Sequence, residues 1–563
     1  MNKIKYAFLG IVAVAFAGCA DLDYNEASNR DEDWTYNSPL NGVKALVYDV
    51  YAQMPSEFKD NSYGNGAMIA SATDESEFAL SFSPIHKYFN GGWTPSNPFS
   101  ITWDRSYRAI TQVHMYLERI HKIDLSDYEY DPDYQTMVQQ FEIFPYELRF
   151  LRAYFYFELV RAYGDVPLVT TTLTNEQANS VERTPAKDVF SIINELDAVA
   201  EYLPVSYNDI PGQEIGRATR GAALALKARV LLYQASPLFN TDNSKELWKE
   251  AAAASKVIID NAQRWGYKLS EYANLWGHDT FTNPEFIFVL GTQASNTFEQ
   301  YNYPVGVENG NSGNCPTQAL VDAYEYQFDG KTFKEKHPGD VDVTAENPYD
   351  GLDPRFALTV VKNGDLWPSN TAQQIAIETY QNGFNGAPKY GATPTGYYLK
   401  KFVDGNCITT ANNQTTTRHN WIVMRLAEVY LNYAEAMYNY YGNADEPGDF
   451  GMSANEAVNV LRNRPDIMMP EFQGNNGFEE RYMRERMVEL AFEGQRFWDV
   501  RRWKKGAEFF KNVDVADFKL DGNGNLILNR VTKTRQWDEK YNLYPIPQSE
   551  IQKNGNLKQN PNW

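Results

Sequence analysis

The stretch "ERMVELAFEGQRFWDVRRW", residues 485–503, interleaves charges of both signs with large apolar side chains. On a helix, residues three or four positions apart are neighbours, so Arg481 faces Glu485 and Glu493 faces Arg496. The apolar residues between these charges predict burial against other helices. We therefore expect the charges to hold helices together rather than to contact a ligand.

Helical periodicity continues on both sides of this stretch. Apolar residues recur at steps of three or four over 425–441 and 478–504, and in several segments between 103 and 265. In "YELRFLRAYFYFELVRAYGDVPLV" we expect the helix to end at Gly164, before Pro167. Three charged residues of this segment have the same expected structural role: Glu147, Arg149 and Arg152.

Two further segments add to the predicted helices. Thr184 is a candidate N-cap, with Pro185 at the first helical position. The alanine-rich run "TRGAALALKARVLLYQAS" is apolar nearly all round, which predicts a helix buried between neighbours. Amphipathic helix pairs at spacings of roughly 30 to 40 residues are typical of tetratricopeptide-like repeats.

The region from about 266 to 420 differs, because Gly, Asn, Pro and Thr dominate and aromatic residues are scattered among them. A region of this composition and length indicates loops that carry recognition on a rigid scaffold. We therefore predict a mostly α fold with a single body over 41–563. In it, helical-repeat segments at about 103–265 and 425–505 support the loop-rich 266–420.

The N-terminus reads as a targeting segment. Lys3 and Lys5 precede an apolar run over 7–17 that is too short to span a bilayer, and small residues then lead to Cys19. This is the lipobox pattern, in which the cysteine thiol takes a diacylglyceryl group. It predicts a signal peptide over 1–18 and a lipidated, flexible stem over 19–40, so that the body is anchored on the membrane.

Several segments, in order along the chain, resemble the SusD/RagB family of outer-membrane nutrient-binding lipoproteins. The acidic "ADLDYNE" after Cys19 is similar to the surface-export signal of such lipoproteins. The resemblance implies a tetratricopeptide-containing fold that sits as a lid on a TonB-dependent, SusC-like transporter at the cell surface and delivers glycan to it. The segments that carry it are "FLRAYFYFELVRAYGDVPLV", "RLAEVYLNYAEA", "NVLRNRPD", "ERMVELAFEGQRFWDVRRW" and "LYPIPQSEI".

Charge and cysteine content limit the partners. The formal net charge is −21, and removal of Lys3 and Lys5 with the signal peptide makes it −23. Such a charge argues against binding nucleic acid, which needs a basic surface. Cys315 and Cys407 are the cysteines that remain after Cys19, and their spacing leaves open whether they pair.

Catalytic motifs were tested and most fail. "GKT" at 330–332 lacks the first glycine of a phosphate loop, where Glu325 stands. "DGNGNLILNRVT" at 521–532 lacks the required calcium-loop residues and is better explained as a hairpin turn. We expect no enzymatic activity, no cofactor and no metal. Paired carboxylates leave a glycoside hydrolase as an alternative: Asp74, Glu75 and Glu77.

A sugar presents apolar C–H faces and hydroxyl groups, so it stacks on exposed rings while polar groups bind its rim. In glycan-binding members of the resembling family, ligand residues lie in the loops before the first long helix and in the middle loop region. Two sets of residues fall there in this sequence. The predicted ligand-binding residues are Asp74, Trp93 and Asn97 in the first region and Tyr301, Tyr303 and Trp367 in the second.

The sequence thus predicts a surface lipoprotein that captures oligo- or polysaccharide without cleaving it and passes it to the transporter. Two alternatives remain beside the hydrolase. The chain is a peptide-binding lid of a peptide importer, or it is a structural lid without ligand affinity of its own.

Overall fold

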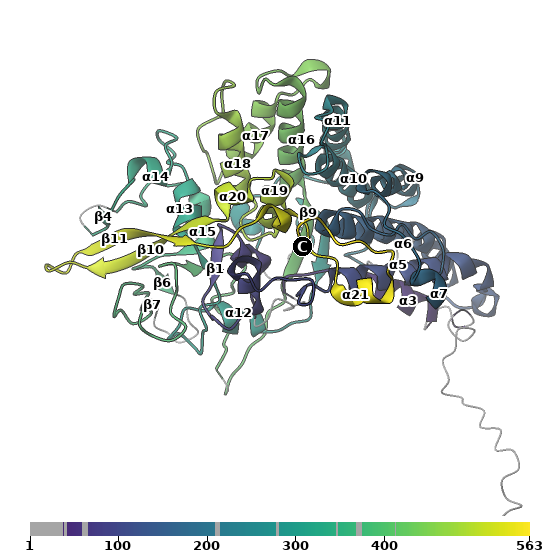
Figure 1. The fold of residues 1–563 in the computed structure, drawn as a ribbon, viewed down its shortest axis with the longest axis horizontal. Helices are drawn as coiled ribbons and strands as arrows, with labels where there is room; N and C mark the ends of the chain where they lie inside the picture. The colour runs from purple at the N-terminus through teal and green to yellow at the C-terminus, as the bar shows by residue number, and fades with distance from the viewer. Residues whose placement is uncertain are drawn as a thin grey trace, which may run out of the picture.

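The computed structural model describes residues 36, 38, 42–58, 66–208, 214–276, 281–344, 347–367, 374–410 and 412–563. Helices gather on one side of the molecule, and short strands with long connections gather on the other (Figure 1). The signal peptide, Cys19 and most of the predicted stem lie outside the described residues. No helix among the described residues is long and apolar enough to cross a membrane.

The helical side is an array in which helices close together in the chain pack on one another, except that α11 packs on α16 across the loop-rich region that separates them in sequence. α5 packs on α6, α6 on α9, α9 on α10, α10 on α11, α11 on α16 and α16 on α17. This arrangement confirms the mostly α, tetratricopeptide-like scaffold. The bounds are α3 Lys44–Ala52, α5 Thr102–Arg119, α6 Tyr134–Tyr163, α9 Asn194–Tyr202, α10 Arg220–Ala235, α11 Lys245–Asn261, α16 Leu426–Tyr441 and α17 Ala454–Arg462.

Local chemistry explains most of the helix ends. α6 ends where expected, because Gly164 adopts a φ of +71° that a side chain would disfavour. The alanine-rich α10 is buried along most of its length, as predicted. The expected N-cap at Thr184 is wrong by one residue. Thr184 pairs with Val166 as an isolated β-bridge, so Pro185 takes the cap position and α8 covers Ala186–Val189.

The segment 478–504 is not one continuous helix. α18 covers Phe478–Glu489 and α19 covers Gln495–Arg502, and the residues between them turn the chain. Phe492 and Gly494 have φ values of +61° and +74° in this turn. The break follows from the two left-handed residues, which cannot continue a right-handed helix.

The expected pairs within this segment are wrong, although their structural role is confirmed. Glu485 bonds Arg355 and Arg462, while Arg481 donates to the backbone carbonyls of Gln473 and Gly474. Glu493 bonds Arg425 and Lys401, and Arg496 bonds Asp74. The charges therefore join distant segments instead of neighbouring turns.

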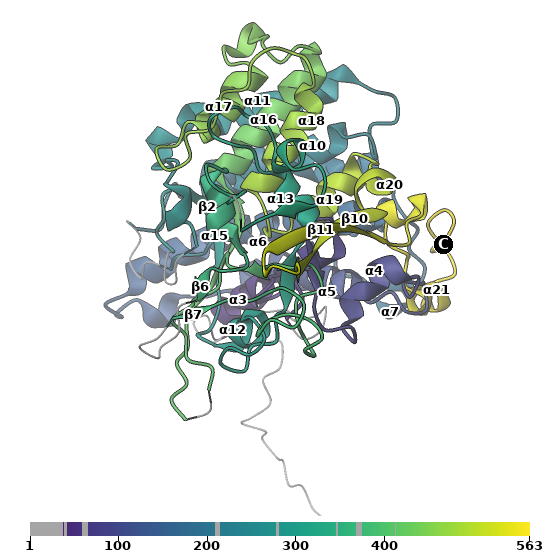
Figure 2. The ribbon, with the colours of Figure 1, turned by 90° about the vertical axis from the view of Figure 1, so that its left-hand side faces the viewer.

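Short antiparallel pairs organise the loop-rich side (Figure 2). The longest pair is β10 with β11, a hairpin in which Leu520 faces Leu526, so the predicted turn is confirmed. The paired strands are β1 Ser76–Phe78 with β3 Asn314–Pro316, β2 Phe286–Gly291 with β9 Asn420–Arg425, β5 Val360–Val361 with β8 Tyr398–Leu399, β6 Leu366–Trp367 with β7 Ile375–Ala376, and β10 Asn512–Leu520 with β11 Leu526–Thr534, which also pairs with β4 Val341–Asp342. Short helices fill the connections: α12 Thr297–Asn302, α13 Gln318–Ala323, α14 Phe333–Lys336 and α15 Pro354–Thr359.

Cys315 and Cys407 do not form a disulfide in this structure. Cys315 and Cys407 are both buried free thiols. Burial raises the pKa of Cys315 to about 12, which keeps that thiol protonated and unreactive.

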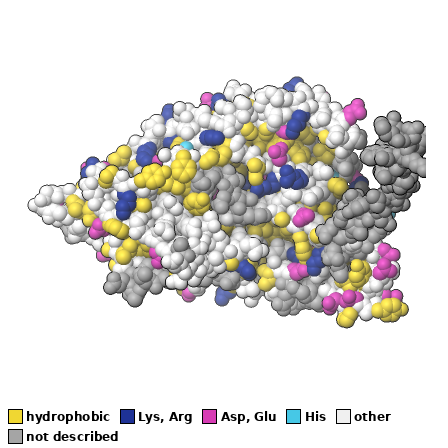
Figure 3. All heavy atoms as spheres, turned by 90° about the horizontal axis from the view of Figure 1, so that it is seen from below, with side chains coloured by type: hydrophobic (Ala, Val, Ile, Leu, Met, Phe, Trp, Pro, Cys, Tyr) yellow, Lys and Arg dark blue, Asp and Glu magenta, His cyan; other side chains and the backbone are white. Residues whose placement is uncertain are grey.

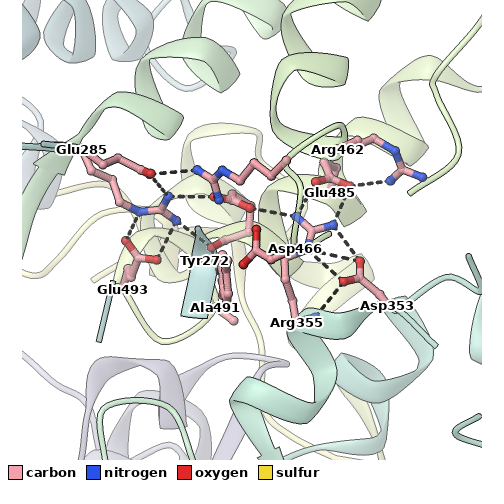
Figure 4. A network of polar contacts seen from close by, with 12 residues as sticks. Tyr272, Glu285, Asp353, Arg355, Arg462, Asp466, Glu485, Ala491 and Glu493 are labelled. Atoms are coloured by element: carbon pink, nitrogen blue, oxygen red, sulfur yellow. Dashed lines mark hydrogen bonds and ion pairs between the residues drawn. The ribbon is translucent and has the colours of Figure 1, made fainter. Parts of the chain in front are cut away.

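A buried ion network joins the helical side to the loop-rich side (Figure 4). The Glu489 carboxylate, at the end of α18, accepts from Arg425 at 2.7 Å and from Arg355 and Arg464 at 2.8 Å each. Arg425 is the last residue of β9, directly before α16, and Arg355 lies in α15. Removing one member of such a network leaves charges buried without a partner, which is strongly destabilising.

The network fixes the ionisation of its members. Burial alone would raise the pKa of Glu489, but the charges of Arg464, Arg425 and Arg355 outweigh it and hold that pKa far below its ordinary value. Burial lowers the pKa of Lys401 to about 8, although Glu493 opposes this change. Because the Glu489 pKa is depressed on folding, its stabilisation is complete above about pH 4.5 and is lost as the pH falls further.

We predict that Glu489→Gln lowers the free energy of unfolding at pH 7 by about 3–5 kcal/mol, because three buried guanidinium groups lose their shared anion. The variant should also lose less stability than wild type between pH 5 and pH 3, since one titrating carboxylate is gone. Chemical denaturation at both pH values measures the two effects. Glu479→Gln, at an exposed position of the same helix, is the control, and equal losses in both variants would contradict the prediction.

Candidate ligand-binding site

A hollow of about 980 Å³ lies between α3, the outer end of β2 and the first turn of α12. Its volume is at the upper end of the range for ligand pockets. α3 and α12 lie on the lower side of the molecule in Figure 1, and Figure 3 shows hydrophobic and basic side chains interspersed across the middle of the face seen from below.

A short segment, residues 214–219, is held against the helical scaffold and forms one wall of the hollow. The buried Glu147 of α6 accepts from Arg217, with Nε at 3.1 Å, and from the Tyr51 hydroxyl. The Tyr51 oxygen in turn accepts from the backbone N–H of Ala218 at 2.8 Å. The wall is therefore fixed to α3 and α6, which confirms the structural role expected for Glu147.

The other two charges predicted with Glu147 are structural as well. Arg149 and Arg152 both bond Glu195 of α9, with Arg149 Nε at 2.6 Å from the carboxylate. These contacts hold α6 and α9 together.

Ion pairs neutralise the charges at the wall. The Glu214 carboxylate lies 2.7 Å from the Lys44 ammonium and 2.8 Å from an Arg217 nitrogen. Burial would raise the pKa of Glu214, but the hydrogen bonds from Lys44 and Tyr48, with the charges of Lys44 and Arg217, hold that pKa below its ordinary value. The wall therefore presents little net charge to a ligand.

Aromatic rings line the rest of the hollow. Phe58 stacks on the His419 ring at 4.8 Å and packs edge-on against Phe298 at 5.0 Å. Phe281 is half-buried and rests on Gly291 at the end of β2, where an added Cβ would come within 2.5 Å of the ring. A glycine is therefore required there for the Phe281 ring to lie across the strand end.

Exposed polar groups complete the lining. Arg418 is exposed, with its guanidinium 6.0 Å from the centroid of the Phe281 ring, and Gln293 is exposed beside it in the lining. Among the described residues, no group of three or more His, Cys, Asp or Glu side chains is arranged to hold a metal ion. A hollow with rings on one side and hydrogen-bonding groups, among them the charged Arg418 guanidinium, on the other suits a polar ligand with apolar faces.

Residues 284–563 match the SusD family, and residues 22–232 match a second family, described as starch-binding proteins associating with the outer membrane. The chain belongs to the SusD family. Among curated relatives, SusD-like protein P2 of Formosa agariphila is 25% identical over 100% of this chain and 99% of its own length.

Solved structures share the fold of this SusD family member. A SusD-like protein of Bacteroides fragilis superposes with a TM-score of 0.76 and 26% identity, over 95% of this chain and 98% of that chain. A laminarin-binding SusD-like protein superposes with a TM-score of 0.58 and 21% identity, over 95% of this chain and 100% of that chain. The family is one of carbohydrate-binding proteins associated with the outer membrane.

Three of the rings predicted to bind sugar are core residues of this SusD family member. Trp93 is 2% exposed and lies among Tyr88, Tyr541, Tyr544 and Trp563. Tyr303 and Trp367 are also buried and pack edge-on against each other at 5.4 Å. Stacking on a sugar needs an exposed ring face, so the exposure expected of these three rings is wrong, while their contact with a ligand stays a prediction.

The remaining predicted ligand residues, Asp74, Asn97 and Tyr301, differ in their burial and contacts. Asp74 is buried and receives two hydrogen bonds from Arg496, at 2.9 and 2.7 Å, so its carboxylate is engaged within the protein and its role in binding stays a prediction. Asn97 is exposed and Tyr301 is half-buried against Gly66. Both lie outside the described lining of the hollow, and their role in binding stays a prediction.

Sequence reasoning missed Phe281 and Phe58. In "DTFTNPEF", Phe281 is flanked by polar residues that favour turns, whereas Phe286 begins the next strand. An aromatic residue in such polar surroundings is a signal of an accessible ring. Phe58 follows α3 in a segment whose pattern gives no such signal. Phe298 also lines the hollow although it is mostly buried.

We predict that Trp93→Ala lowers the free energy of unfolding by about 3–5 kcal/mol, because it empties a site in the core. Its effect on ligand affinity, measured below the unfolding transition, should be small. Thermal unfolding and a binding isotherm on the same preparation test both statements. A variant with wild-type stability and lost binding would restore Trp93 to the ligand site.

Proposed function

We propose that this protein captures a neutral oligo- or polysaccharide in the hollow beside α3 and delivers it, uncleaved, to a TonB-dependent transporter in the outer membrane. The observation that carries the proposal is the lining of the hollow, where aromatic rings adjoin exposed hydrogen-bonding groups and the charges of the 214–219 wall are paired. The family's carbohydrate-binding character and the fold shared with a laminarin-binding protein support the same ligand class.

Binding without hydrolysis agrees with the surroundings of Asp74, Glu75 and Glu77, the carboxylates of the hydrolase alternative. Asp74 is engaged by Arg496, and Glu77 accepts from Lys533 at 2.9 Å. Burial, with the nearby Asp74 charge, raises the pKa of Glu75 well above its ordinary value, and the cations near it only partly offset this. A glycosidase needs two carboxyl groups that face the same sugar. Asp74 and Glu77 are instead bonded to cations, and Glu75 is buried.

The ligand class also sets the expected affinity. Association costs several kcal/mol before any gain appears. Ring stacking contributes roughly 1–3 kcal/mol per ring on the scale measured for bases on aromatic side chains. A site with two or three rings should therefore have a Kd in the micromolar to millimolar range. Such an affinity suits capture followed by release to a transporter.

We predict that Phe281→Ala weakens glycan binding about tenfold, because it removes a stacking face without opening the core. Isothermal titration with laminarin and with starch-derived maltooligosaccharides measures the loss. Affinity should change little between 50 and 500 mM salt, since a neutral sugar has no charge to screen. Tyr390→Ala, which removes an exposed ring outside the hollow, is the matched control.

Three results would count against this proposal. Equal binding by Phe281→Ala and wild type would exclude the hollow as the site. Shortened products after incubation would show a hydrolase. Tight, salt-sensitive binding of peptides with no affinity for any glycan would favour the peptide-importer alternative.

We further propose that Cys19 carries the lipid anchor that keeps the body near the transporter. The lipobox sequence supports this, and a diacylglyceryl group supplies the two chains that stable anchoring needs. Cys19→Ala should move the protein from the membrane fraction to the aqueous phase on detergent partitioning. Retention in the detergent phase would refute lipidation at this residue.

A further inference from the structure

A second hollow of about 370 Å³ adjoins the first. Five residues line both, so the two are separated only by a shared wall: Ile215, Gly216, Arg217, Phe281 and Val289. The second hollow extends from this wall over the loop that follows α11, where Trp265 and Tyr267 lie.

The shared wall is well suited to lie under a ligand. Ile215 is 45% exposed, so an apolar side chain stands beside the half-buried Phe281 ring. Gly216 has a φ of +96°, and a Cβ added to it would lie only 3.3 Å from the Val289 carbonyl oxygen. A side chain therefore has little room there. The wall is held by the bonds from Arg217 to Glu147 and Glu214.

The chemistry of the second hollow matches that of the first. Arg217 is the one charged side chain in its described lining, and its charge is taken up by Glu147 and Glu214. Half-buried Trp265 offers a ring, while exposed Asn208 and Thr282 offer an amide and a hydroxyl. Rings with neutral hydrogen-bonding groups again suit a sugar rather than a charged ligand.

We infer that the two hollows form one extended groove, and that the ligand is a glycan chain long enough to cross Ile215 and Phe281 and stack on Trp265. This inference rests on the proposed function and deepens it, because it names a polymer or long oligomer instead of a short sugar. A ligand confined to the first hollow gains nothing from Trp265, so chain length is the property that reveals the second subsite.

The experiment compares short and long ligands of two neutral series, laminaritriose with laminariheptaose and maltotriose with maltoheptaose, on the soluble body over 41–563 and on the full chain. Wild type should bind the heptasaccharide of its preferred series about tenfold more tightly than the trisaccharide. Trp265→Ala should abolish this difference and leave the trisaccharide affinity unchanged. Arg418→Ala, in the first hollow alone, should weaken both lengths.

A second variant guards against a folding defect in Trp265→Ala. The double change Asn208→Ala and Thr282→Ala alters only exposed groups of the second hollow, and it should reduce the heptasaccharide advantage by at least threefold with wild-type thermal unfolding. Equal affinity for both lengths in wild type, or an undiminished advantage in these variants, overturns the extended groove while glycan binding stands. Failure of every glycan to bind overturns the proposed function itself.

Discussion

The contact on which the rest of the structure depends is one carboxylate shared by three guanidinium groups. Glu489 closes the end of α18 and binds arginines from β9, from α15 and from the segment after α17. A buried ion cluster of this kind is often no more stabilising than apolar packing, but any of its charges left without a partner is strongly destabilising. It thereby fixes the position of the loop-rich side on the helical array, and the hollow lies where those two sides meet.

The sequence was sufficient for the features that depend on local pattern. The 3.6-residue periodicity gave α6, α10 and α16, and Gly164 marked the end of α6 because left-handed backbone favours glycine. The pairing of charges was not predictable in this way. Glu485 has a candidate partner one helical turn away, yet it binds Arg355, which is 130 positions distant and reaches it only through the tertiary fold.

The candidate site was harder to predict for a related reason. Trp93 and Trp367 stand among Gly, Asn and Pro residues, and such surroundings suggest exposure. Their rings are buried because other loops fold over them, which no pattern along the chain records. Phe281 was recoverable from its polar turn, whereas the role of Glu147 behind the wall depends on Tyr51 and Arg217 meeting it from two other segments.

The bonds between Arg496 and Asp74 join residues 422 positions apart, and Tyr88 meets Tyr544 across 456 positions. The helices from α5 to α11, in contrast, pack on helices close to them in sequence and can form early as the chain is made. The loops around Asp74 and Tyr88 must wait for segments that are synthesised much later. The segment around Asp74 and Tyr88 is therefore synthesised early but completes its packing late. Until then its apolar residues stay exposed and can bind chaperones.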